Sequence, residues 1–166
     1  MIPADALPPG YSRAGLEAFM REALALAEEA GLDGEMPIGA LVVIDGEVVS
    51  RGRARHQSRR SQLAHAELEA LESGGERLWE GYERALLVST LQPCPMCLGA
   101  TVMADVPHIV FAAHDALVGT EQTVETNPYV RRHITTWLGG VLESESLALI
   151  ERFDRRMLAY VRGDRE

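Results

Sequence analysis

Cysteine is scarce in this sequence, and long apolar runs are absent from it. Only two of the 166 residues are cysteines, and both lie in the string Pro93-Cys94-Pro95-Met96-Cys97. No run reaches the roughly 18 apolar residues of a membrane span, so we expect no membrane association. Residues 1–10 contain three prolines and no basic segment, which does not fit a signal peptide. A cytoplasmic protein without a disulfide framework is therefore expected.

Positive charge is also in short supply. The chain has 16 Lys and Arg against 25 Asp and Glu, a net charge of −9. Neutralising nucleic acid phosphates needs a basic face, so we do not expect general electrostatic binding to nucleic acid. One dense basic cluster remains, and it is either a solvated loop, which we favour, or a local basic patch. It consists of Arg51, Arg53, Arg55, Arg59 and Arg60.

Neither an internal repeat nor a low-complexity linker divides the chain. Its 166 residues suit one domain, and the apolar content of 46% suffices for a core. We expect a loose N-terminal arm over residues 1–11 and a single domain over residues 12–166.

Apolar spacing and turn residues predict an alternation of strands and helices. Helices are expected over 12–30, 64–73, 95–105 and 143–161, and strands over 38–44, 47–51, 85–90, 108–113 and 134–137. Asp45-Gly46 predicts a hairpin turn, and residues 119–132 are expected to be mostly loop. Phe111 and Met103 are most simply core residues. The order predicts a three-layer α/β/α sandwich with a central mixed five-stranded sheet.

Two short strings hold the candidate chemistry: Ala64-His65-Ala66-Glu67 and Pro93 to Cys97. His65, Cys94 and Cys97 offer zinc one imidazole and two thiolates, and they leave a fourth position open for water. Both strings fall at expected helix starts. There the side chains of His65 and Glu67 can face one point, and the free N–H groups support thiolates. We therefore expect one Zn²⁺ per chain.

Glu67 has a role beside the metal. Two thiolates and a neutral imidazole cancel the zinc charge, so the metal can still lower the pKa of its water towards about 7. A carboxylate beside that water can accept its proton and pass it to a substrate, as general base and then general acid. The alternative is a zinc site that only stabilises the fold, with Glu67 as an incidental surface residue. The two strings together favour catalysis.

H-x-E followed by P-C-x-x-C is the signature of zinc deaminases that act on nucleobases. The chain resembles the cytidine and deoxycytidylate deaminase superfamily, and within it the branch of tRNA-specific adenosine deaminases and guanine deaminases. The matching segments are Pro37-Ile38-Gly39-Ala40, residues 65–67, residues 93–100, and Ala113, Asp115 and Gly119. The resemblance implies a cytidine deaminase-like fold, a homodimer, and a substrate cleft lined by the turn with His114 and Asp115.

Two positions depart from that branch. Its members usually have an asparagine where this chain has Ala54, and alanine has no side-chain hydrogen bond to offer. Recognition there is lost, or it is supplied by Arg53, Arg55 or His56. Gln92 replaces the family's glutamate, which is a mild change. The candidate substrate contacts are Ala54, His56, Ala66, Pro93, His114 and Asp115.

Three functions follow from these residues. The leading hypothesis is a hydrolytic deaminase of a small purine-type nucleobase or nucleoside, similar to guanine deaminase. The second is a tRNA-specific adenosine deaminase, against which the net charge and Ala54 count. The third is a catalytically idle, zinc-bound interaction protein, against which Glu67 counts.

Overall fold

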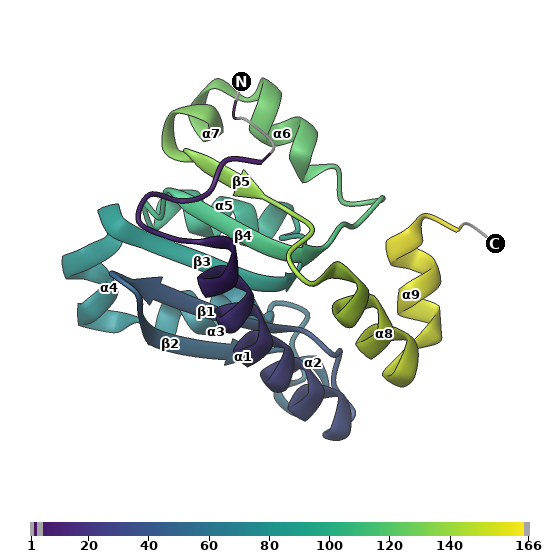
Figure 1. Cartoon of the computed structure of the whole chain (residues 1–166). Helices are drawn as coiled ribbons and strands as arrows, with labels where there is room; N and C mark the ends of the chain where they lie inside the picture. The colour runs from purple at the N-terminus through teal and green to yellow at the C-terminus, as the bar shows by residue number, and fades with distance from the viewer. Residues whose placement is uncertain (1, 3–4, 165–166) are drawn as a thin grey trace.

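A computed structural model describes residues 2 and 5–164, so residues 1, 3 and 4 of the expected arm lie outside the described part. The elements alternate along the chain (Figure 1). In order they are α1 (Arg13–Leu32), β1 (Gly39–Ile44), β2 (Glu47–Arg53), α2 (His56–Arg59), α3 (Ala66–Ser73), α4 (Gly75–Gly81), the 3₁₀ turn η1 (Tyr82–Arg84), β3 (Ala85–Leu91), α5 (Pro95–Met103), β4 (His108–Ala113), α6 (Thr120–Thr126), α7 (Pro128–His133), β5 (Thr136–Leu138), α8 (Glu143–Phe153) and α9 (Arg155–Arg162).

The five strands form one mixed sheet in the order β2-β1-β3-β4-β5. β1 pairs antiparallel with both β2 and β3, whereas β3, β4 and β5 run parallel. The carboxyl ends of β3, β4 and β5 therefore meet at one edge, where α/β proteins place their ligands. This confirms the mixed five-stranded sheet expected from the sequence.

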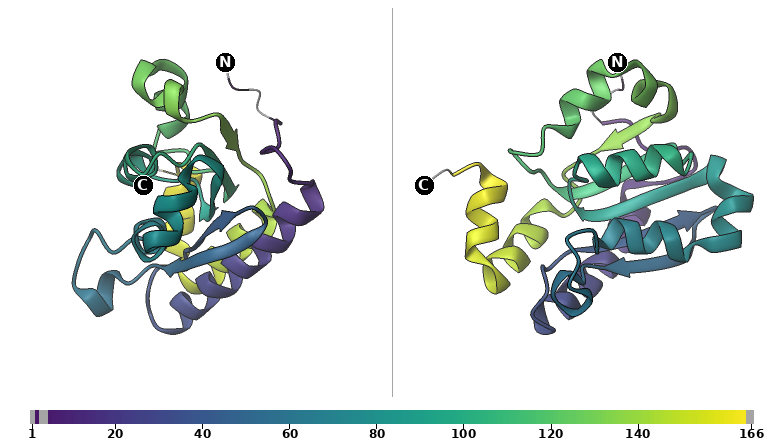
Figure 2. Two further views of the ribbon diagram at one scale, coloured as in Figure 1. Left: turned by 90° about the vertical axis from the view of Figure 1, so that its left-hand side faces the viewer. Right: turned by 180° about the vertical axis from the view of Figure 1, so that it is seen from behind.

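Helices cover both faces of the sheet (Figure 2). α1 packs on β1 and β3 and also contacts α8, while α3 packs on the other face against β2 and β1 and contacts α5. Successive residues along each strand point alternately to the two helical layers. Leu41, Leu86 and Val110 face the α1 side, whereas Val42, Leu87 and Ile109 belong to the cluster on the α3 side. The three-layer sandwich is confirmed.

Two glycines let the helices approach the sheet closely. A Cβ at Gly39 would overlap the carbonyl oxygen of Ala23 in α1, and a Cβ at Gly52 would overlap that of Ala66 in α3. Only glycine allows backbone to meet backbone at these crossings. The second crossing bears on the site, because Ala66 stands between His65 and Glu67.

The hairpin turn forms as expected. Asp45 and Gly46 both have positive φ, 51° and 82°, as the tight turn between two antiparallel strands requires. The N-terminal segment makes some contacts in its described part. Pro8 is buried, and the Tyr11 hydroxyl accepts a hydrogen bond from the Gly46 N–H. Whether residues 1–11 behave as a loose arm remains a prediction.

The segment over 119–132 was wrongly expected to be mostly loop. It contains α6 and α7, because the Asn127-Pro128 pair starts a helix here instead of marking a loop. The Asn127 side chain accepts from the N–H groups of Tyr129 and Val130, and Pro128 takes the first helical position.

Asp154 also starts a helix that was not expected. It divides the expected single last helix into α8 and α9, and its carboxylate accepts from the Met157 N–H.

Two further expectations need correction. α4 was not anticipated, because Gly74 and Gly75 were taken only as the end of the preceding helix. α4 starts at Gly75, whose φ is 51°. Met103 lies on the outer face of α5 and is 72% exposed, so it is not a core residue, whereas Phe111 is fully buried.

Within the described residues, no helix combines the length and the apolarity needed to cross a bilayer.

The Gly52 crossing yields a test of the fold. Gly52→Ala should lower the free energy of unfolding by about 1–3 kcal/mol, because the added methyl must push β2 and the start of α3 apart. Gly99→Ala is the matched control. Its added Cβ meets nothing within 4 Å, and it should raise stability by roughly 0.5–1 kcal/mol as a helical glycine replaced by alanine. Urea unfolding measures both. Equal stabilities for Gly52→Ala and wild type would contradict the close approach.

Candidate metal centre and active site

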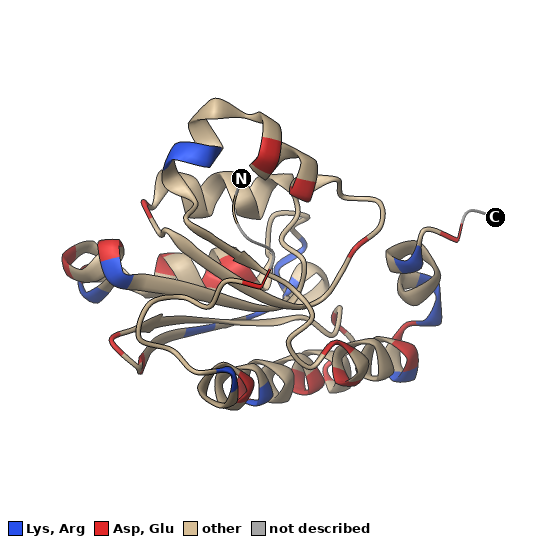
Figure 3. Ribbon diagram, turned by 45° about the horizontal axis from the view of Figure 1, so that its top comes forward, with Lys and Arg blue, Asp and Glu red and all other residues tan. Residues whose placement is uncertain are grey.

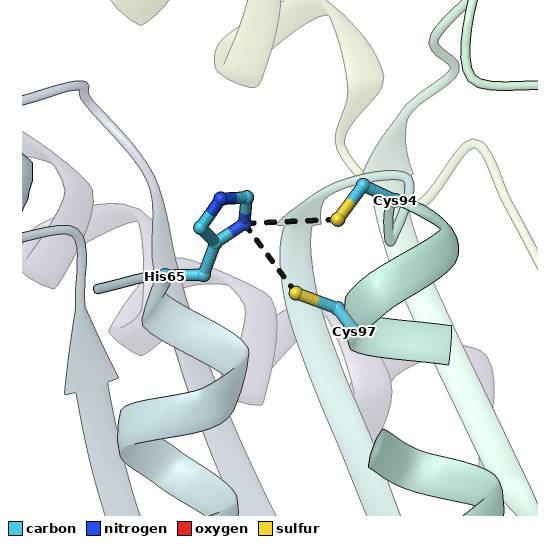
Figure 4. A group of neighbouring side chains, drawn as sticks. All are labelled: His65, Cys94 and Cys97. Atoms are coloured by element: carbon cyan, nitrogen blue, oxygen red, sulfur yellow. Dashed lines mark hydrogen bonds between the residues drawn. The ribbon is translucent and has the colours of Figure 1, made fainter. Parts of the chain in front are cut away.

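Three side chains from two helix starts converge at the carboxyl end of β3 (Figure 4). His65 Nδ1 lies 3.4 Å from Cys97 Sγ and 3.7 Å from Cys94 Sγ. All three donor atoms lie within 4.8 Å of one another. One imidazole and two thiolates form a donor set that zinc prefers. The expected zinc site is confirmed in its residues and in their proximity.

Local backbone structure explains this convergence. His65 is the N-cap of α3 and Cys94 is the N-cap of α5, and both have extended backbone (φ −79°, ψ 150° and φ −67°, ψ 170°). Pro95 follows at the first helical position, where its missing N–H costs nothing. Cys97 then lies one turn into α5, on the same side as Cys94. The sequence prediction that both strings stand at helix starts is correct.

The two thiols are electrostatically coupled. Hydrogen bonds from the Cys97 thiol and, to a lesser extent, from the His65 imidazole lower the pKa of Cys94 to about 4. The Cys94 sulfur and burial together raise the pKa of Cys97. A separate hydrogen bond, from the His65 imidazole to the Cys94 sulfur, raises the pKa of His65. Zinc binds cysteine as thiolate, so metal binding must release the protons that the free thiols hold.

Glu67 lies in the first turn of α3 and is only 4% exposed. Burial raises the pKa of its carboxyl group above the ordinary value. The Ser89 hydroxyl, fully buried on β3, donates a hydrogen bond of 3.3 Å to Glu67 Oε1. Sequence reasoning missed Ser89, because a serine within an apolar strand gives no signal until the strand is placed beneath α3.

His56 stands directly against the metal ligand. Its ring packs edge-on against the His65 ring with centroids 4.9 Å apart, and only 8% of the residue is exposed. Burial lowers the pKa of His56, and His65 lowers it further. Its Nδ1 has no hydrogen-bond partner among the described residues. The turn that holds it is capped by Glu35, which accepts from the N–H groups of Gln57 and Ser58.

The three small residues among the candidate substrate contacts are all buried. Ala54 and Ala66 are fully buried, and Pro93 is buried before Cys94. The Ala54 N–H donates to the carbonyl of Ile38, so its backbone continues the sheet. The side chain of Ala54 belongs to the buried apolar core, whereas the ring of His56 packs against that of His65.

His114 and Asp115 follow β4 but face different partners. Asp115 is buried and accepts from the N–H groups of Leu117 and Val118. Burial raises the pKa of the Asp115 carboxyl group, and the charge of the Cys94 sulfur contributes to this shift. The His114 ring instead donates from Nδ1 to Glu143 at 2.9 Å, at the start of α8.

Gln92, two residues before the ligand Cys94, forms hydrogen bonds with the turn after β4 and with the start of α6. Its Oε1 accepts from the Asp115 N–H, and its Nε2 donates to the Thr120 hydroxyl at 2.9 Å. A neutral amide can donate and accept at once, which a carboxylate cannot do. The replacement of the family's glutamate therefore has a structural use that the sequence did not reveal.

The arginine cluster of residues 51–60 is largely neutralised by carboxylates. Arg51 pairs with Glu22 at 2.6 Å and Arg53 with Asp33 at 2.7 Å. Arg55 and Arg59 share Glu69, at 3.0 and 3.2 Å. Acidic and basic positions are also interleaved along the helices (Figure 3). A solvated, ion-paired segment describes this cluster better than a free basic patch.

The metal assignment can be tested by replacing one thiolate. Protein purified without chelator should contain about one zinc per chain, and Cys97→Ser should weaken retention at least tenfold, because a hydroxyl is a poor substitute for a thiolate. Ser89→Ala is the control, since Ser89 touches Glu67 and no ligand. Elemental analysis after dialysis measures both proteins. A Cys97→Ser protein with undiminished zinc would refute the ligand set.

Comparison with known proteins agrees with this geometry. Residues 14–113 match the family model described as the cytidine and deoxycytidylate deaminase zinc-binding region. The tRNA-specific adenosine deaminase of Bacillus subtilis (strain 168) is 36% identical over 145 residues, which cover 85% of this chain and 89% of that protein.

Two solved structures illustrate the shared fold. A structure from work on A-to-I editing by tRNA:A34 deaminases superposes with a TM-score of 0.72 at 32% identity, covering 80% of this chain and 98% of that chain. The guanine deaminase of Nitrosomonas europaea gives 0.68 at 25% identity, covering 89% and 93%. The fold, the ligand set and the family match agree, and the chain belongs to the cytidine and deoxycytidylate deaminase family of zinc enzymes.

Proposed function

We propose that this chain hydrolyses the exocyclic amine of a small purine-type nucleobase or nucleoside, similarly to guanine deaminases. The observation that supports this most is the buried carboxylate of Glu67, two residues after the metal ligand His65. Burying a carboxylate costs free energy, and a purely structural zinc site does not require one. A proton carrier beside the metal is what hydrolytic deamination requires.

Glu67 is proposed to move both protons of the reaction. When bound, zinc supplies a Lewis acid that lowers the pKa of a water molecule. Glu67 accepts a proton from the attacking water and delivers it to the ring nitrogen. It then takes the remaining proton from the hydroxyl group that has added to the carbon and transfers it to the amine, which leaves as ammonia while the carbonyl forms. The Ser89 hydroxyl holds Oε1, and burial stabilises the protonated carboxyl group between the two transfers.

A free small substrate is favoured by the charge around the site. Four of the five arginines in residues 51–60 have carboxylate partners, and the whole chain has a net charge of −9. Phosphate binding would have to break these pairs. The homodimer and the cytoplasmic location expected from the sequence remain proposals. The exposed apolar side of α5, with Met103, is a candidate contact for a second copy.

His56 is proposed as the group that recognises the substrate. Ala54 has no side-chain hydrogen bond to offer, whereas His56 has a buried nitrogen without a partner among the described residues. A buried polar atom of this kind discriminates strongly once a substrate pairs with it. A substrate nitrogen or amine beside the metal ligands would satisfy it.

Deamination of adenosine in tRNA is the second candidate. It is favoured by the 36% identity to the tRNA-specific adenosine deaminase of Bacillus subtilis over most of both chains. The two candidates share the reaction at the metal centre and differ in the size and charge of the substrate.

Ammonia release from a panel of substrates tests the proposal. Wild-type protein should release ammonia from at least one of guanine, adenine, cytosine, their nucleosides, triazines or pterins. It should prefer that compound to a tRNA anticodon stem-loop. Glu67→Gln should reduce turnover by about 10⁴-fold or more, because two proton transfers use one group. Its zinc content should stay near that of wild type.

Each result has a defined meaning. Preference for the stem-loop would replace the proposal with the tRNA candidate. Zinc-loaded protein without activity on any compound would favour the idle interaction protein. Near-normal turnover by Glu67→Gln would remove Glu67 from the mechanism, and loss of zinc from that variant would make it a ligand.

His56→Phe tests recognition. The substitution keeps an aromatic ring against His65 but removes both nitrogens. We expect kcat/KM to fall by about 10–100-fold, the value of one buried polar contact, with unchanged zinc content. His108→Phe is the matched control, since His108 is half-buried at the opposite end of β4. Steady-state kinetics on the active compound measure both. Equal kcat/KM for His56→Phe and wild type would exclude His56 from substrate binding.

A further inference from the structure

The segment over 55–64, which contains α2, has few apolar anchors. Every residue of this range is described, and within it His56 alone is buried, while Leu63 is 64% exposed. The His56 ring packs edge-on against the ring of the metal ligand His65. Segments with so few buried apolar contacts open readily. Polar contacts must therefore hold this ring in its place.

Glu35 supplies two such contacts. Its Oε2 accepts from the Gln57 N–H at 2.8 Å, and its Oε1 accepts from the Ser58 N–H at 2.7 Å. Each carboxylate oxygen thus holds one of the two N–H groups that follow His56. Hydrogen bonds to a charged acceptor are shorter and stronger than neutral ones. Glu35 is also only 9% exposed, so water competes little for these bonds.

The end of α1 fixes Glu35 itself. Gly34, with φ 78°, turns the chain after this helix, and the Glu35 N–H donates to the Ala30 carbonyl at 2.9 Å. α2 lies beside this end of α1 (Figure 1). α1 packs on the sheet face opposite to α3, so the group that holds the segment belongs to a different layer from the metal ligand.

Glu69 is the other carboxylate that contacts this segment, but its contacts are more exposed. It accepts from the Arg53 N–H at 3.0 Å and pairs with Arg55 and Arg59 at 3.0 and 3.2 Å. The two arginine side chains are 40% and 52% exposed, and ion pairs at such positions contribute little. Glu35, in contrast, binds the backbone of the turn directly.

We propose that Glu35 is a positioning residue that holds the His56 ring against the metal ligand His65. It acts through the two N–H groups that follow His56. The proposal rests on the proposed function in one respect, that His56 recognises the substrate. Without the carboxylate, two N–H groups would lose their protein partner and the segment would open more often. His56 would then meet the substrate in the right geometry less often.

Nuclear magnetic resonance of zinc-loaded protein tests this contact without turnover. The chain has five histidines, and His56→Phe identifies the ring signals of His56 by their loss. Wild type should show a nuclear Overhauser effect between the rings of His56 and His65. Glu35→Gln should reduce it about threefold or more, because an amide has one acceptor oxygen where the carboxylate has two.

Two further variants guard this measurement. Glu35→Asp keeps the charge but is one methylene shorter, so it should also weaken the effect, even if Glu35→Gln does not fold. Asp154→Asn is the matched control. It likewise replaces a carboxylate that accepts a backbone N–H, that of Met157 at the start of α9, and it should leave the effect between the rings unchanged.

Steady-state kinetics separates positioning from general destabilisation. Glu35→Gln should raise KM for the active compound about 3–10-fold and change kcat by less than about twofold, because Glu67 and the metal ligands are retained. In a double-mutant cycle, adding Glu35→Gln to His56→Phe should lower kcat/KM by less than about twofold more. The ring through which Glu35 acts is already absent from that protein.

The outcomes are distinct. An unchanged effect between the rings in both Glu35 variants, an equal loss in Asp154→Asn, or full additivity of Glu35→Gln with His56→Phe would each overturn positioning by Glu35. A fall in kcat at constant KM would do so as well. Zinc-loaded protein without activity on any compound would refute the proposed function, and the magnetic resonance experiment would still decide whether Glu35 holds His56.

Discussion

The meeting of two helix starts at one edge of the sheet is the constraint on which the site depends. A ligand residue is the N-cap of each of the helices α3 and α5. His65 and Cys94 therefore face each other where the two helices begin. The parallel arrangement of β3 and β4 brings the turn after β4 to the same edge. Gly52 lets α3 approach β2 closely enough for this alignment. Metal ligands, proton carrier and the turn with Asp115 are therefore positioned by backbone packing.

Burial gives the residues of this centre their different properties. His65 and Cys94 remain partly accessible, whereas Glu67 and Cys97 are buried. Burial raises the pKa of the Glu67 carboxyl group, whereas the hydrogen bond from the Cys97 thiol lowers the pKa of the Cys94 thiol. Cys94 and Cys97 lie one turn of α5 apart, and Glu67 lies in the first turn of α3. The fold thereby combines in one site a carboxyl group with a raised pKa and a thiol with a lowered pKa, which suits a site that must bind a metal and move protons.

Short motifs and turn residues predicted much of this arrangement. The strings around His65 and Cys94 identified the metal ligands because ligand spacing is a local property. Asp45-Gly46 and the apolar strands gave the sheet for the same reason. The helices over 120–133 were missed, because Asn127 and Pro128 serve equally well in a loop and at a helix start. Ser89 and Glu35 were missed because their partners lie 22 residues away along the chain, and only the fold brings them together.

The order of the strands also bears on how the protein behaves at high concentration. β2 and β5 are the two edges of the sheet, and an exposed edge can pair with the edge of another molecule. β5 is only three residues long, which leaves little backbone for such pairing. β2 is longer, but it bears Glu47, Arg51 and Arg53, and each of these makes an ion pair. A second strand that added to β2 would have to displace or approach these charges. The ion-paired charges along β2 thus also protect the chain against aggregation through its longer edge.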